Sequence, residues 1–289
     1  MSDTFTTILI FCGVLVLYIH IYKHQKCSND LEVYEIVEIT KDRLDEVLET
    51  LQPAVFTDPD IETLNMDSYH AFDVKIRNVN DHEIDISELY LPFSLTDAKK
   101  LFEKDVSKNY FSENNSEFLV ETGLVKKVQF EDELLRPSMC SNIFYDLLMG
   151  SKDVFTPFRY HIHNRQFFVV LEGSVLVKLS PPKSSKFLDS IADYDNFEFR
   201  SKQNPFSSTF SKKVKCMDIE LKEKQILFLP PYWWYSIKFN CNNTKVLSYS
   251  YRTFMSTVSI FPQLFMSFLQ AHNIKRHRYP TLCKQLNHV

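Results

Sequence analysis

The sequence predicts a mainly β domain with flanking helices, of the α+β class, placed after one N-terminal transmembrane helix. Three observations lead to this prediction. Residues 5–22 form an almost wholly apolar run. Within residues 143–251, short apolar stretches alternate with turn residues, which is typical of consecutive strands. Apolar residues at helical spacing occur before this region, in residues 42–51, and after it, in residues 260–272.

The chain shows no internal repeat and no low-complexity linker. We therefore expect an anchor with a short link at residues 1–27 and a single domain at residues 28–289. Within this domain we expect a lead-in α/β part at about 28–133, a strand-rich part at about 134–255, and a C-terminal helix with a basic tail at 256–289.

Composition excludes several classes of function. The 289 residues include only 4 Gly, and neither a phosphate-binding loop nor a dinucleotide-binding glycine motif occurs. A formal net charge of -4 gives no general attraction to nucleic acid, so no nucleic-acid partner is expected. The six cysteines form neither a C-x-x-C pair nor a zinc-finger pattern, and we interpret them as scattered reduced thiols.

The N-terminal apolar run is interpreted as a single-pass membrane anchor, and the membrane is the predicted partner. Its length is near the lower limit of the roughly 17 to 25 residues needed to cross a bilayer. A cleaved signal peptide and a buried helix are the alternatives, but no basic residue precedes the run and no small-residue cleavage pattern follows it. Lys23, His24 and Lys26 follow the run, so the positive-inside rule places the C-terminal domain in the cytosol.

The lead-in part is expected to mix strands and helices. Thr40 and Thr96 are candidate helix caps. The predicted elements are strands at 31–39, 54–56 and 71–77, helices at 42–51, 61–68 and 96–108, a polar loop at 110–116 and a helical turn at 132–135.

The strand-rich part centres on residues 155–182. This stretch has a strand beginning with polar and aromatic residues at 155–164, a long apolar strand, a tight turn at Gly173, a second strand and a stop at Pro181-Pro182. Further strands are expected at 143–149, 216–221, 226–229, 236–240 and 246–251, a short helix at 187–192 and an irregular polar loop at 193–211.

Three further segments have a structural interpretation. Asp193, Asp195 and Glu198 form an acidic loop, which we expect to be solvated because it lacks calcium-loop spacing. The apolar residues of 260–272 predict a helix that packs on the domain, with a membrane helix as the alternative. The basic residues of 275–278 predict a solvated tail, with contact to phosphate or lipid as the alternative.

Several motifs occur in the order found in one known family. The most specific is Leu229-Pro-Pro-Tyr-Trp-Trp-Tyr235, which resembles that family's Pro-Pro-x-Trp-Trp-His segment. The supporting pieces are Leu135-Arg-Pro137, Phe144-Tyr-Asp-Leu-Leu-Met-Gly150, Thr156-Pro157, Gly173, Pro181-Pro182, Ser248-Tyr-Ser-Tyr251 and, earlier in the chain, Val37-Glu-Ile-Thr40 and Gln52-Pro-Ala-Val-Phe56. Residues 134–251 thus resemble the cupin-like, JmjC-related domain of the 2-oxoglutarate oxygenase superfamily.

This resemblance implies a double-stranded β-helix, that is, a cupin or jelly-roll barrel with flanking helices. Active members of the family hold Fe(II) with a His-x-Asp/Glu pair and a distant His, and a lysine binds the 2-oxoglutarate carboxylate. Aligning Thr156-Pro157 with the family motif places Arg159 at the first His and His161 at the acidic ligand. The distant His is replaced by Tyr235, and Val175 falls on the lysine.

Arginine stays protonated in proteins and cannot ligate iron, so the site departs from the active pattern at three of four positions. One rescue remains open, because His161 and His163 are two residues apart and would share a face on a strand. A third ligand would then have to come from Tyr160, Tyr235 or an unidentified residue. The alternative interpretation is that Arg159, His161, His163 and Tyr235 form a polar, hydrogen-bonded barrel mouth without metal.

The functional prediction follows from this loss of ligands. We expect a membrane-anchored, cupin-like pseudoenzyme that acts as a binding or structural module, with no cofactor and with a protein partner left open. The alternative is a divergent hydroxylase that depends on Fe(II) and 2-oxoglutarate and uses His161 and His163.

Overall fold

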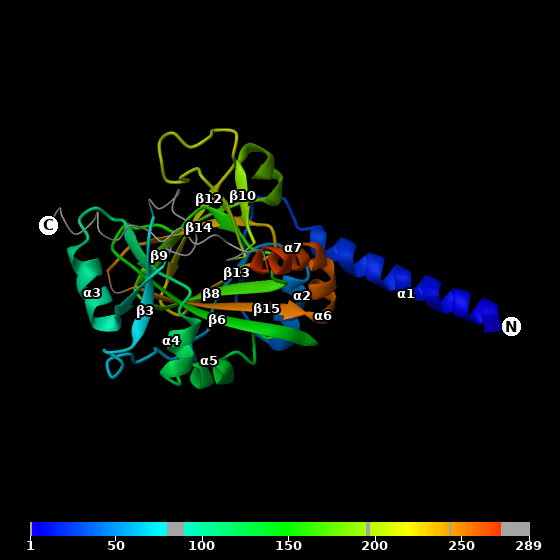
Figure 1. The fold of residues 1–289 in the computed structure, drawn as a ribbon, viewed down its shortest axis with the longest axis horizontal. Helices are drawn as coiled ribbons and strands as arrows, with labels where there is room; N and C mark the ends of the chain where they lie inside the picture. The colour runs from blue at the N-terminus through cyan, green and yellow to red at the C-terminus, as the bar shows by residue number, and fades with distance from the viewer. Residues whose placement is uncertain (1, 80–89, 195–196, 243, 273–289) are drawn as a thin grey trace.

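The computed structural model describes residues 2–79, 90–194, 197–242 and 244–272. The chain is mainly β, with two sheets packed face to face and helices on the outer face of the larger sheet. The long helix α1 (Ser2–Gln25) projects away from this body (Figure 1). The mainly β prediction with flanking helices and one long apolar N-terminal helix is therefore confirmed.

The larger sheet has nine strands in the order β1-β2-β13-β8-β15-β6-β5-β3-β4. Only the β1–β2 pair is parallel among these described strands. Strands from the lead-in part extend both edges of the sheet. The bounds are β1 Tyr34–Ile36, β2 Ala54–Thr57, β3 Asp73–Asn78, β4 Leu91–Ser94, β5 Tyr110–Ser112, β6 Cys140–Gly150, β8 Arg165–Glu172, β13 Gln225–Leu229 and β15 Lys245–Thr253.

The smaller sheet has six strands in the order β10-β11-β7-β14-β9-β12, and all its pairs are antiparallel. From β6 to β15, successive strands alternate between the two sheets, except that β9 to β12 all lie in the smaller sheet. The bounds are β7 Arg159–Tyr160, β9 Ser174–Ser180, β10 Ser190–Asp193, β11 Glu198–Ser201, β12 Met217–Lys222 and β14 Trp234–Phe239.

The first apolar core lies between the nine-stranded sheet and four helices. Each helix turns apolar residues toward the sheet, such as Leu44 and Leu48 of α2, which are buried. Thr40 caps α2 by accepting from the Arg43 backbone N–H, as predicted, whereas Ser94 rather than Thr96 caps α3. The helices are α2 Lys41–Leu48, α3 Leu95–Lys104, α4 Ser116–Glu121 and α5 Val125–Glu131.

The second apolar core fills the space between the two sheets. In β8, Phe167, Val169 and Leu171 face the helices, while Phe168 and Val170 face the smaller sheet. Strand β8 is thus buried on both faces, which explains its uninterrupted apolar sequence. Trp233 and Trp234 are both fully buried.

Several predicted elements of the chain are wrong. Residues 61–68 form no helix but an irregular segment that ends in a turn, and in it the buried Leu64 and Met66 alternate with exposed neighbours. The helix expected at 187–192 is a 3-10 helix at Pro182–Phe187 followed by β10. The loop expected at 110–116 contains β5, and the loop expected at 193–211 contains β11. No helix was predicted where α4 and α5 lie.

The C-terminal helices α6 (Phe254–Ser259) and α7 (Phe261–Ala271) lie at the end of the domain from which α1 projects (Figure 1). The expectation that this region packs on the domain is met only on one side. Ile260 is buried and Leu264 packs beside it, but the other apolar side chains of α7 are exposed. The basic residues of 275–278 lie outside the described residues.

Gly173 makes the turn between β8 and β9. Its φ is +78°, and a Cβ added there would lie 2.6 Å from Thr244 Oγ1 and 3.2 Å from Thr244 Cα. Alanine at this position would combine a left-handed backbone with a clash, so Gly173→Ala is expected to lower the free energy of unfolding by about 2 to 4 kcal/mol. Urea unfolding of the detergent-solubilised chain measures this change.

Gly123 offers a matched control. Its φ is +73°, but a Cβ there would meet no atom within 4 Å. Gly123→Ala should therefore lower the free energy of unfolding only by the cost of a left-handed backbone at alanine, about 1 to 2 kcal/mol. Equal losses at the two glycines would show that the close approach to Thr244 contributes nothing.

Candidate functional site

The two positions identified from separate sequence motifs are cross-strand neighbours. Strand β7 lies between β11 and β14, and Arg159 pairs directly with Tyr235 in the β7–β14 register. The Arg159 guanidinium carbon lies 5.7 Å from the centroid of the Tyr235 ring. The structure therefore brings these two predicted site residues together, as an arginine over an aromatic face.

The two histidines lie beside this pair. The ring of His161 is 5.9 Å from that of His163 and 6.2 Å from that of Tyr235, measured between centroids. They do share one side, as expected, but the strand ends at Tyr160 and the histidines occupy the segment that connects β7 to β8. Of the strand predicted at 155–164, only Arg159 and Tyr160 form a strand, β7.

Val175 and Tyr160 have other surroundings. Val175 is completely buried in the core between the two sheets and offers no donor for a carboxylate. Tyr160 stacks on Phe199 at 5.2 Å and meets Trp234 edge-on at 4.9 Å. The Tyr160 ring thus belongs to an aromatic cluster with Phe199 and Trp234.

A cavity of about 200 Å³ opens beside the histidines. Polar and charged side chains dominate its wall, and they come from both sheets. The lining residues are Tyr90, Glu113, Asn114, Asp146, Arg159, Tyr160, His161, His163, Gln166, Phe197, Glu198 and Tyr235.

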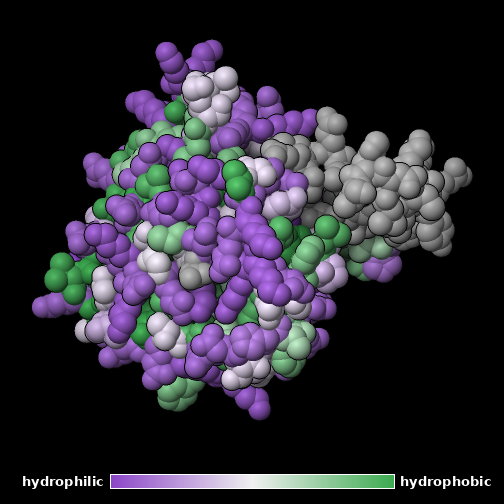
Figure 2. Space-filling model, turned by 90° about the vertical axis from the view of Figure 1, so that its left-hand side faces the viewer, coloured by the Kyte–Doolittle hydropathy of each residue, from purple (hydrophilic) through white to green (hydrophobic). Residues whose placement is uncertain are grey.

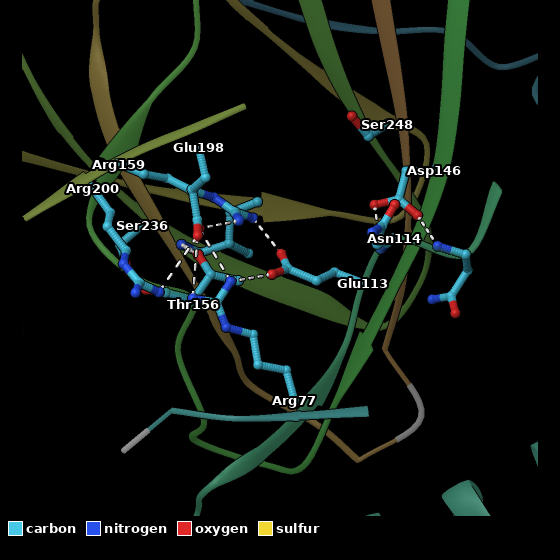
Figure 3. Close-up of polar contacts among 12 residues, drawn as sticks. Arg77, Glu113, Asn114, Asp146, Thr156, Arg159, Glu198, Arg200, Ser236 and Ser248 are labelled. Atoms are coloured by element: carbon cyan, nitrogen blue, oxygen red, sulfur yellow. Dashed lines mark hydrogen bonds and ion pairs between the residues drawn. The ribbon is translucent and has the colours of Figure 1, made fainter. Parts of the chain in front are cut away.

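Arg159 does not stand alone in this wall but belongs to a buried ion cluster (Figure 3). Its guanidinium donates to Glu198 Oε1 at 2.8 Å and to Glu113 Oε2. Arg77 donates to Glu113 Oε1 at 2.7 Å and to both oxygens of Glu198 at 3.1 and 3.2 Å. The Arg200 guanidinium lies 3.5 Å from Glu198 Oε2.

The ion cluster joins the two sheets. Arg77 is on β3 and Glu113 directly follows β5 in the larger sheet, whereas Arg159 is on β7 and Glu198 on β11 in the smaller sheet. Arg77, Glu113 and Glu198 are each less than a tenth exposed. Buried opposite charges stabilise this contact between the sheets only as long as every member keeps its partners.

The charge states in the cluster follow from these contacts. Burial alone would raise the pKa of the Glu113 carboxyl, but the Arg159 and Arg77 guanidiniums outweigh it and hold that pKa at about 2. Burial likewise opposes ionisation of Glu198, and the same two arginines lower its pKa. Both carboxyls are therefore ionised at neutral pH and compensate the arginines.

Asp146 faces the same cavity from β6 without a cationic partner in the described contacts. Its carboxylate accepts from the backbone N–H groups of Asn114 at 2.9 Å and Asn115 at 2.6 Å. Burial raises its pKa to about 6 despite these two donors. Asp146 is thus the one carboxyl in the wall whose ionisation changes near neutral pH.

The residues present do not fit the iron centre that the family resemblance implies. The guanidinium of Arg159 occupies the position of the first ligand and is bound to two carboxylates. His163 Nδ1 accepts from Arg252 Nε at 3.2 Å, so this nitrogen is engaged. Within the described part of the chain, no three His, Cys, Asp or Glu side chains are grouped closely enough to hold a metal ion.

His161 has a different character. It is 7 % exposed, and its ring nitrogens make no hydrogen bond of normal geometry among the described residues, although backbone groups of Leu229 and His163 lie near the ring. Burial lowers its pKa to about 3, so the ring is neutral at physiological pH. An unpaired imidazole at the wall of a polar cavity is a candidate contact for a small bound molecule.

Sequence reasoning missed most of the ion cluster. Glu198 was expected in a solvated acidic loop, and this expectation is wrong because β11 turns it into the interior. Arg77 is the last residue of the strand predicted at 71–77. Alternation along this strand places Arg77 on the face opposite Val74 and Ile76, and this was the only signal in the sequence that it belongs to a site. Glu113 lies in a segment read as a polar loop and gave no signal.

The buried imidazole predicts a pH dependence of stability. The pKa of His161 is about 3 in the folded chain against an ordinary 6.5, so its stabilising contribution is present above pH 6.5 and is lost as pH falls. Between pH 7 and pH 5 this histidine should lower the free energy of unfolding by about 2 kcal/mol. His161→Leu should remove that part of the slope.

Denaturant unfolding at both pH values tests this expectation. The matched control is His70→Leu, because His70 is exposed in the folded chain. An identical pH slope in the unmodified chain and in His161→Leu would contradict the assignment.

Fold and site together define a class: a protein of two packed β sheets with a long apolar N-terminal helix and a buried ion cluster in a polar mouth. No family model matches the chain, and no curated protein matches it at a significant level.

Proposed function

We propose that the chain is a membrane-anchored, cupin-like domain related to JmjC domains, without a catalytic metal, that acts as a binding or structural module. The single observation that carries the proposal is the state of Arg159. A side chain that cannot bind iron stands at the first ligand position, and two buried carboxylates hold it there. Tyr235, the second altered ligand position, lies directly opposite.

The strand order supports the double-stranded β-helix. Eight strands, β6 to β9 and β12 to β15, follow one another along the chain apart from the inserted β10 and β11. Numbered one to eight, they have the order 1-8-3-6 in the larger sheet and 2-7-4-5 in the smaller sheet. A jelly roll wound from two antiparallel ribbons has this alternation of strands between sheets.

The N-terminal helix supports the anchor. Residues Asp3–Gln25 form a helix that is long and apolar enough to cross a membrane, and none of its most apolar window is buried by the domain. The basic residues Lys23 and Lys26 at its end favour a cytosolic domain by the positive-inside rule. Digestion of sealed membrane vesicles with protease tests this orientation, since a cytosolic domain is cleaved in inside-out vesicles only.

Metal analysis tests the absence of a catalytic centre. The full chain is loaded anaerobically in detergent with Fe(II) and 2-oxoglutarate and is then freed of unbound iron. It is expected to retain iron far below one ion per chain, and to turn over no co-substrate after oxygen is admitted. The double change His161→Ala and His163→Ala is the matched control, and its iron content should equal that of the unmodified chain.

One observation favours a second candidate, a divergent hydroxylase dependent on Fe(II) and 2-oxoglutarate. His161 presents two unpaired ring nitrogens in the wall of the cavity. Stoichiometric iron that disappears in the double histidine variant, together with co-substrate turnover, would replace the first proposal with this one.

A further inference from the structure

The C-terminal helices expose an uncharged, strongly apolar surface. Residues 253–271 contain no charged side chain. By contrast, the face of the domain remote from α1 is mostly hydrophilic (Figure 2). The exposed large apolar side chains of the two helices are Phe254, Val258, Phe261, Phe265, Met266, Phe268 and Leu269.

Helix α7 has two apolar faces with different surroundings. The inner face begins at the buried Ile260 and continues with Leu264, which packs against Ile162 and its neighbours in the domain. The outer face carries Phe261 and Phe265, whose rings stack at 6.3 Å and are 63 % and 49 % exposed. A helix that is apolar on both sides is covered on both sides in its working state.

The exposed apolar surface of α6 and α7 adjoins the C-terminal end of α1. Helix α6 packs against α1, and a cavity of about 260 Å³ at their junction is lined by His20, Lys23 and His24 of α1 and by Phe254 and Met255 of α6. Helix α6 therefore begins at the level of the last turn of α1.

That level corresponds to a membrane surface. The candidate span Asp3–Gln25 has 23 residues. At about 1.5 Å per residue its length is roughly 35 Å, slightly more than the roughly 30 Å of a bilayer's hydrocarbon core. When α1 crosses the bilayer, its last turn lies at the interface, and α6 lies there with it.

We propose that α6 and α7 lie on the surface of the same bilayer that α1 crosses, with Phe254, Phe261 and Phe265 inserted at the boundary between headgroups and acyl chains. This inference rests on the membrane anchor of the proposed function and adds a second contact to it. Interfacial helices bury an apolar face by about 5 to 10 Å in this boundary. Their usual basic face is absent here because the domain covers the inner side of α7.

A bilayer fits this surface better than a protein partner does. Protein interfaces carry a polar rim and about one hydrogen bond per 100 to 200 Å². Residues 253–271 offer no charge that would fix a partner's register. The position beside α1 brings this surface to lipid whenever the anchor is inserted.

Quenching of tryptophan fluorescence by brominated lipid tests the proposal. The full chain carrying Phe265→Trp is reconstituted in phosphatidylcholine vesicles with or without bromine on the acyl chains. The native Trp233 and Trp234 are fully buried, and the unmodified chain supplies their background. The added tryptophan should lose at least half of its emission in brominated vesicles.

Phe130→Trp is the matched control, because Phe130 is an exposed phenylalanine on α5, on a different side of the domain from α6 and α7 (Figure 1). Its added emission should be unaffected by bromine. Equal emission of Phe265→Trp in both kinds of vesicle would overturn the docking, and a blue-shifted but unquenched emission would overturn it in favour of a protein cover.

Carbonate extraction separates this proposal from the anchor. A chain that stays in carbonate-washed vesicles without quenching at residue 265 retains the anchor but has no docked helix. A chain that carbonate removes has no spanning α1, and quenching before extraction would then still support surface binding by α6 and α7.

Discussion

Arg159→Met is expected to lower the free energy of unfolding by about 3 to 5 kcal/mol, because it leaves two buried carboxylates to share the remaining arginines. Glu113 would lose its bond from Arg159 and, among the described residues, keep Arg77 and the Tyr90 hydroxyl as neighbouring donors. Methionine fills a similar volume, so the loss reports the charge and not a cavity. Urea unfolding of the detergent-solubilised chain at pH 7 measures it.

A second change distinguishes an uncompensated charge from lost packing. Adding Glu113→Gln to Arg159→Met removes one carboxylate and leaves the paired contact of Arg77 with Glu198 intact. The double variant should recover part of the stability that Arg159→Met loses. Additive losses from the two changes would contradict the ion-cluster interpretation.

The same cluster predicts acid sensitivity. The pKa of Glu113 is about 2 when folded, below the ordinary 4.5, so its contribution is present above pH 4.5 and is lost as pH falls toward 2. In the Glu113→Gln chain this part of the acid transition should be absent, and unfolding followed by circular dichroism between pH 5 and pH 2 detects the difference.

Trp233→Ala is expected to have an effect of similar size, about 3 to 5 kcal/mol, because it empties a large volume in the core between the sheets. The Trp233 side chain is completely buried, and its indole N–H donates to the backbone oxygen of Ser28 at 3.1 Å. Trp233→Phe keeps most of the packing and loses only this bond and some volume. It should lower the free energy of unfolding by about 1 to 2 kcal/mol.

Proteolysis gives a local readout of the same bond. Lys26 is exposed and lies two residues before Ser28. Trypsin should cleave after Lys26 faster in Trp233→Phe than in the unmodified chain, because the link loses one of the hydrogen bonds that hold it. Unchanged cleavage in that variant would show that the bond to Ser28 does not restrain the link.

Local sequence signals predicted the elements whose stability depends on their own residues. The apolar run of α1, the Thr40 cap and the Gly173 turn are all determined within a few residues. Failures occurred where distant contacts decide, as at residues 61–68, where Leu64 and Met66 are buried in the core of the domain but no helix forms. The inserted β10 and β11 pair with each other and with β7, which no local pattern indicates.

The candidate site divides in the same way. The motif alignment selected Arg159 and Tyr235, and the sheet register places them opposite each other. The ion partners of Arg159 could not be predicted from the sequence, because Arg77 and Glu113 are separated by 36 residues and Arg77 and Glu198 by 121. Ion pairs between residues far apart in the chain depend on the geometry of the sheets. The spacing of these residues along the sequence does not indicate that geometry.

The short link after α1 determines how the domain meets other molecules. Its backbone is bonded to the domain on both sides, since the Ser28 N–H donates to Leu51 O at 3.2 Å and Ser28 O accepts from Trp233. Asn29 Oδ1 accepts from the Lys183 backbone N–H at 2.9 Å. If α1 anchors the chain in a membrane as proposed, these bonds limit how far the domain can tilt or reach away from its anchor, and they keep the cavity near Arg159 close to one height above the bilayer. Molecules diffusing in the same membrane plane would therefore meet it in two dimensions, at a high effective concentration.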